Sequence, residues 1–72
     1  MDSNSCIVEI VYKLLEFGYF DSNEFCLENN INKRKIYRYI SIIKTKFFNL
    51  GLYHIDIFYS RSSQVYKCII NN

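Results

Sequence analysis

The chain has 72 residues, half of them hydrophobic and 13 of them aromatic, and its net charge is only +2. A chain of this length forms one small domain, and we expect residues 1–72 to make up that domain. Such a domain buries only about 60% of the surface that its unfolded form exposes, so little room remains for an active site beside the core. The hydrophobic content predicts a folded chain rather than a disordered one.

Several classes of protein are disfavoured by what the sequence lacks. No apolar run approaches the ~20 residues of a membrane-spanning helix, and the first residues are polar and acidic, so we expect a cytoplasmic protein without membrane contact. Cys6, Cys26 and Cys68 are isolated, which disfavours a disulfide framework or a metal site, and we interpret Cys26 and Cys68 as small buried hydrophobes. With two glycines and no recognisable catalytic group, we expect no enzyme, cofactor or small-molecule ligand.

The charges are divided unevenly along the chain. Residues 1–30 carry six acids and one base, a net charge of −5, whereas residues 31–72 carry eight bases and one acid, a net charge of +7. Such a division indicates that the second half binds a polyanion, although a basic face exposed only to water would give the same pattern.

The first element in chain order is a helix over about residues 5–17. Ser3, Asn4 or Ser5 is suited to cap its start, and Gly18 is suited to end it. The apolar residues recur at helical spacing, at Ile7, Ile10, Val11, Leu14 and Leu15.

A second, shorter helix is predicted over about residues 22–29. Asp21 with Glu24 three residues later fits a capping box, and Phe20 with Phe25 fits a hydrophobic staple across the start of the helix. We expect this helix to stop at Asn29–Asn30, because asparagine tolerates positive φ better than most residues.

A third helix is predicted over about residues 32–49, with Asn32 as its cap and Leu50–Gly51 at its end. Its expected buried stripe is Ile36, Ile40, Ile43 and Phe47, flanked by Tyr39. After it, two segments rich in β-branched and aromatic residues flank the polar turn 60–64, so we predict a β-hairpin over about residues 53–70. The fold class is therefore α+β, with three helices followed by a hairpin.

The segment that joins the second and third helices has the features of a helix-turn-helix. That motif needs a small residue where the helices cross, a turn residue tolerant of positive φ, a buried aliphatic residue and a cap for the next helix. Cys26, Asn30, Ile31 and Asn32 meet these needs in that order.

Residues 25–43 resemble the helix-turn-helix of DeoR-type and related winged-helix bacterial regulators, whose pattern is roughly Leu-Ala-x-x-x-Gly-Val-Ser-x-x-Thr-Ile-x-Arg-Asp-Ile-x-x-Leu. Ile36, Arg38 and Ile40 match this pattern in identity, whereas Lys35 and Tyr39 stand where the family has Thr and Asp. The family's wing closes with a Tyr-x-Leu strand, to which residues 66–68 correspond loosely. The resemblance implies a winged helix-turn-helix that binds double-stranded DNA.

In that fold the start of the third helix enters the major groove, and the hairpin contacts the DNA backbone or the minor groove. The expected DNA-binding residues are Asn32, Lys33, Arg34, Lys35, Tyr37, Arg38, Lys44 and Arg61. Arginine is suited to read guanine, and lysine to neutralise phosphate. A transcription regulator is the expected role, and an accessory protein that marks a site on a plasmid or mobile element is an alternative.

A winged helix that binds only proteins is a further alternative, because the aromatic residues exceed the needs of so small a core. Those that are candidates for a contact surface are Tyr12, Phe17, Tyr19, Phe20, Phe48, Tyr53, Phe58 and Tyr59. A homodimer is also expected, since one recognition helix reads only a few base pairs. Its predicted interface contains Tyr12, Phe17 and Tyr19.

Overall fold

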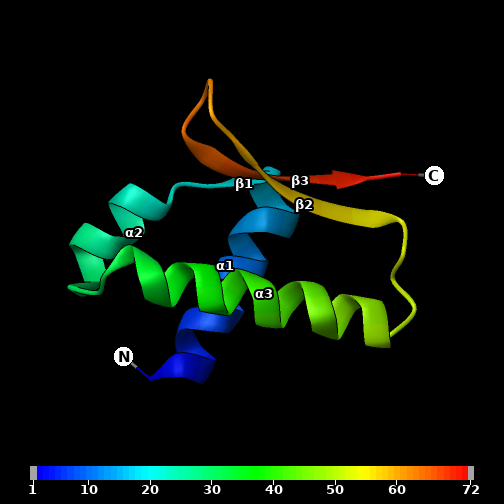
Figure 1. The fold of residues 1–72 in the computed structure, drawn as a ribbon, viewed down its shortest axis with the longest axis horizontal. Coiled ribbons are helices and arrows are strands. Elements are labelled where there is room, and N and C mark those ends of the chain that lie inside the picture. Colours follow the sequence, from blue (N-terminus) through cyan, green and yellow to red (C-terminus); the bar gives the residue numbers. More distant parts are fainter. Residues whose placement is uncertain (1, 72) are drawn as a thin grey trace.

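The chain folds into three helices and a three-stranded antiparallel sheet, so the predicted α+β class and the order of helices and hairpin are confirmed. The structure is a computed structural model that describes residues 2–71; Met1 and Asn72, the two ends of the predicted domain, lie outside the described residues. The elements in chain order are α1 (Ser3–Phe17), β1 (Tyr19–Phe20), α2 (Ser22–Asn29), α3 (Lys33–Asn49), β2 (Ile55–Ser60) and β3 (Val65–Ile70). In Figure 1, α3 runs along the longest axis, α1 crosses behind it, and the sheet lies to one side of both helices.

The ends of the helices are set by capping residues. α1 starts two residues earlier than predicted because Asp2, and not one of the three predicted residues, is its cap: the Asp2 carboxylate accepts a hydrogen bond of 2.7 Å from the Ser5 amide. Gly18 ends the helix at φ 80°, as predicted. Asp21 accepts from the amides of Asn23 and Glu24, and therefore caps α2 as predicted.

The turn between α2 and α3 has the predicted geometry. Asn30 lies in the left-handed region, at φ 53° and ψ 48°, and its amide donates to the Cys26 carbonyl. The Asn32 side chain accepts from the Lys35 amide at 3.2 Å, which opens α3. These two asparagines therefore end α2 and begin α3 within three residues.

The sheet contains one strand that the sequence analysis missed. No helix or strand was predicted at Tyr19–Phe20, but these residues form β1, which pairs with β3 through Tyr19 opposite Lys67 and Phe20 opposite Tyr66. The strand order is therefore β1-β3-β2, with β3 in the middle. The hairpin itself starts later than predicted, because residues 53 and 54 belong to a turn before β2. Two residues are too few for a periodic pattern, which explains why β1 escaped prediction.

The core lies between α1, α3 and the sheet. Its buried residues are Cys6, Ile10, Leu14, Phe20, Phe25, Ile36, Tyr39, Ile40, Ile43, Ile57 and Tyr66. Three expectations were wrong in detail: Leu15 of the predicted α1 stripe is 47% exposed, Phe20 is buried and so unavailable to a contact surface, and Cys26 and Cys68 are only partly buried. Cys6 is the cysteine that the core encloses. No helix within residues 2–71 has the length and apolar character needed to cross a membrane.

The left-handed turn at Asn30 provides a test of the fold. Asn30→Ala should lower the free energy of unfolding by about 1 kcal/mol, because a Cβ in this region clashes with the backbone and alanine lacks the compensating polar side chain. Asn30→Gly should leave stability unchanged or raise it slightly, because glycine adopts this conformation freely. Urea denaturation of both variants measures the difference, and equal stability of the two would show that residue 30 does not adopt positive φ.

Candidate nucleic-acid interface

The outward side of α3 carries a ridge of polar and basic side chains. Residues of a helix turn by about 100° each, so Arg34, Arg38, Ser41 and Thr45 lie along one line of the helix surface. All four are exposed, and this line lies opposite the buried Ile36 and its neighbours in the core. We call these four residues the outer ridge.

A groove separates α3 from the sheet on one side of the outer ridge. It has a volume of about 400 Å³ and is lined by Tyr37, Ile40, Ser41, Lys44, Thr45 and Tyr66. Tyr37 is 61% exposed, so its ring projects from the helix rather than packing into the core. The groove therefore joins the exposed face of α3 to the middle strand of the sheet.

The remaining predicted residues of α3 lie around its first turn. Lys33 and Lys35 are both exposed, and Lys35 lies one helical turn from Arg38. Asn32 is exposed, but its side-chain oxygen is engaged as the cap of the helix. The structure thus brings the basic residues of the first two turns together, while Lys44 lies further along, at the groove.

Arg61 lies at the tip of the hairpin, the start of the four-residue loop 61–64. Figure 1 shows this tip projecting beyond the body of the molecule, on the same half of the view as α2 and the start of α3. Tyr59 and Tyr66 pair across the strands below the tip, with ring centroids 5.1 Å apart. Because Tyr66 also lines the groove, aromatic side chains connect the hairpin tip to α3.

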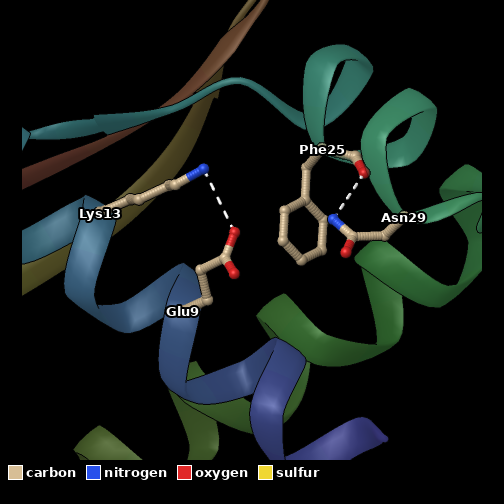
Figure 2. A network of polar contacts seen from close by, with 4 residues as sticks. All are labelled: Glu9, Lys13, Phe25 and Asn29. Carbon is tan, nitrogen blue, oxygen red and sulfur yellow. Dashed lines mark hydrogen bonds and ion pairs between the residues drawn. The ribbon is translucent and has the colours of Figure 1, made fainter. Parts of the chain in front are cut away.

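The basic side chains of α3 and the hairpin tip have no acidic partner in the described part of the chain. Between residues 2 and 71, the one ion pair joins Lys13 to Glu9, at 3.3 Å, and Lys13 also lies 5.6 Å from the centre of the Phe25 ring. Figure 2 shows this pair on α1 beside Phe25 and Asn29 of α2. Lys13, the one basic residue in residues 1–30, is therefore paired within the protein, whereas the basic residues of α3 and the hairpin tip remain available to a partner.

The surroundings of Tyr66 at the groove favour its neutral phenol. Burial is the largest cause that raises the pKa of Tyr66 to about 12, and the neighbouring phenols of Tyr37 and Tyr59 contribute to the same shift. Burial also raises the pKa of the thiols of Cys26 and Cys68, which keeps both of them protonated and unreactive at neutral pH.

Ser41, Thr45 and Tyr66 were not among the expected DNA-binding residues, and Tyr59 was expected only as a candidate for a protein-contact surface. A signal for the first two was present, because both fall at helical spacing from Arg34 and Arg38. The two tyrosines required the register of the hairpin, which follows only once Ser60 is known to pair with Val65. Comparison of the chain with known protein families, with curated proteins and with solved structures found no match.

The environment of Tyr66 predicts a pH dependence. Because its folded-state pKa lies near 12 and its ordinary value is 10.0, folding favours the neutral phenol. Tyr66 therefore contributes stability that is present in full below pH 10 and is lost as the pH rises through 12. An ultraviolet titration should show one tyrosine that ionises last, and Tyr66→Phe should remove that step. Loss of the same step in Tyr53→Phe instead would assign it to another ring.

Proposed function

We propose that this chain is a winged helix-turn-helix domain that binds double-stranded DNA, with α3 as its recognition helix. The observation that carries the proposal is the basic first half of α3, which is exposed, free of acidic partners within residues 2–71, and followed by a hairpin with an arginine at its tip. A helix of 17 residues with one exposed basic side has the form required to enter the major groove.

The turn before α3 supports the helix-turn-helix interpretation. The left-handed Asn30, the partly buried Ile31 and the cap Asn32 have the conformations and environments that the motif requires. A strand order of β1-β3-β2, with a hairpin that extends from the sheet, agrees with a wing. The proposal therefore draws on the backbone as well as on the charges.

Each site residue has a definite role in the proposed complex. Arg34 and Arg38 read base edges in the major groove, and Lys33, Lys35 and Lys44 neutralise phosphates. Tyr37 packs against a thymine methyl group or a sugar. Arg61 contacts the backbone or the minor groove, and the amide end of α3 at Asn32 favours a nearby phosphate.

The biological role that follows is that of a transcription regulator acting in the cytoplasm. A protein that marks a site on a plasmid or mobile element would use the same surface, so the two roles are separated by the location of the binding sites rather than by the fold. Selection of bound duplexes from random sequences, followed by a search of the surrounding genome, distinguishes them.

Replacement of the ridge arginines tests the recognition helix. The double variant Arg34→Ala, Arg38→Ala should bind the selected duplex at least about 30-fold more weakly, since each well-paired arginine contributes about 1–3 kcal/mol. Lys13→Ala is the matched control and should bind as the wild type does, because Lys13 is already paired with Glu9. Gel-shift titrations at physiological salt measure both effects, and undiminished binding by the double variant would refute the assignment of α3.

Replacement of Arg61 tests the wing. Arg61→Ala should weaken binding to all sequences about equally, because a backbone contact carries no base preference. The slope of log affinity against log salt concentration should become shallower by about one phosphate contact. An unchanged slope would mean that the hairpin tip does not touch DNA.

A further inference from the structure

The side of α1 that faces away from the core is apolar. Val8, Tyr12 and Leu15 are 68%, 57% and 47% exposed, and their spacing of four and three residues places them in one stripe along the helix. This stripe lies opposite the buried Ile10 and Leu14. α1 therefore has two apolar sides, of which the core uses one.

The stripe continues past the end of α1. The rings of Tyr12 and Phe17 are 6.0 Å apart, and those of Phe17 and Tyr19 are 6.5 Å apart. Phe17 and Tyr19 are themselves 57% and 51% exposed. Together with Val8 and Leu15 these rings form one surface, which we call the α1 patch.

We propose that the α1 patch is a dimer interface and that its partner is a second copy of this chain, related by a two-fold axis. Each half-exposed ring offers about 100 Å² of apolar surface, and Val8 and Leu15 together offer about 200 Å² more. The apolar part of the patch is thus about 500 Å². Since interfaces are about 60% apolar, this corresponds to about 800 Å² per protomer, the size of a stable interface.

The patch itself carries no charge, which permits contact with an identical surface. A two-fold interface brings each group close to its own copy, so a strongly charged rim would repel itself. None of the five patch residues is charged, and Glu9 and Lys13 at its edge neutralise each other. Three acids at the rim, Glu16, Asp21 and Glu24, form no ion pair within residues 2–71.

The position of the patch leaves the candidate DNA surface free. The patch and the outer ridge lie on the sides of α1 and α3 that face away from the shared core, and α1 crosses behind α3 in Figure 1. A second copy docked at α1 therefore does not cover Arg34 or Arg38. The choice of a second copy over another partner rests in part on the proposed function, because two recognition helices read a site of sufficient length.

Sedimentation equilibrium of the full chain and its variants tests the proposal. The wild type should be a dimer at concentrations of tens of micromolar, and Tyr12→Lys or Val8→Lys should shift it to a monomer by weakening association more than about tenfold. Tyr53→Lys is the matched control, because Tyr53 is 69% exposed but lies beside Phe48, at the end of α3. Circular dichroism and thermal melting should show that all the variants remain folded.

The outcomes separate this proposal from the proposed function. A wild type that stays monomeric in solution, or a dimer that survives both substitutions in the patch, would overturn the interface. A monomer whose patch binds a different protein would overturn it as well. If the monomeric wild type still bound a single half-site, DNA binding would stand without the dimer, whereas a dimer that binds no duplex would refute only the DNA-binding function.

Discussion

The arrangement of this small protein depends on the burial of one aromatic ring, Phe20. Its side chain is 1% exposed, and its centroid lies 5.2 Å from that of Phe25 and 6.5 Å from that of Tyr66. It thereby connects the segment after α1 to the start of α2 and to the middle strand of the sheet. Since a ring of this size contributes several kcal/mol when it is buried, it accounts for a large part of the stability of so short a chain.

The position of Phe20 also explains why two residues form a strand. The ring is held between α2 and β3, so the backbone at residues 19 and 20 must run alongside β3, where it pairs with Lys67 and Tyr66. Asp21 directly follows and caps α2. Within the four residues after α1, the chain therefore forms β1, because Phe20 is buried, and begins α2, because Asp21 caps it.

The features that could be predicted are those set by local chemistry. The caps at Asp21 and Asn32, the left-handed Asn30 and the apolar period of α3 each follow from a few neighbouring residues, and the structure has them as expected. The formation of β1, the burial of Cys6 and the exposure of Leu15 depend on the segments that pack around them. A helical period does not specify those segments. For the same reason the basic residues and Tyr37 of α3 were predictable, whereas the pairing of Tyr59 with Tyr66 required the register of the hairpin.

The core and the candidate site of α3 constrain each other, because they share one helix. Ile36, Ile40 and Ile43 set the side of α3 that faces the core, and the helical period then places Arg34 and Arg38 on the opposite side. A substitution in the core that rotated the helix would move both arginines away from the exposed surface of α3 without changing either residue. The exposed side of α1 is free of such a constraint from the domain itself: Val8, Tyr12 and Leu15 have no role in its core, yet they are apolar and regularly spaced. Apolar side chains kept in water do not stabilise a domain of this size, so a surface that buries them is the physical explanation that the spacing favours.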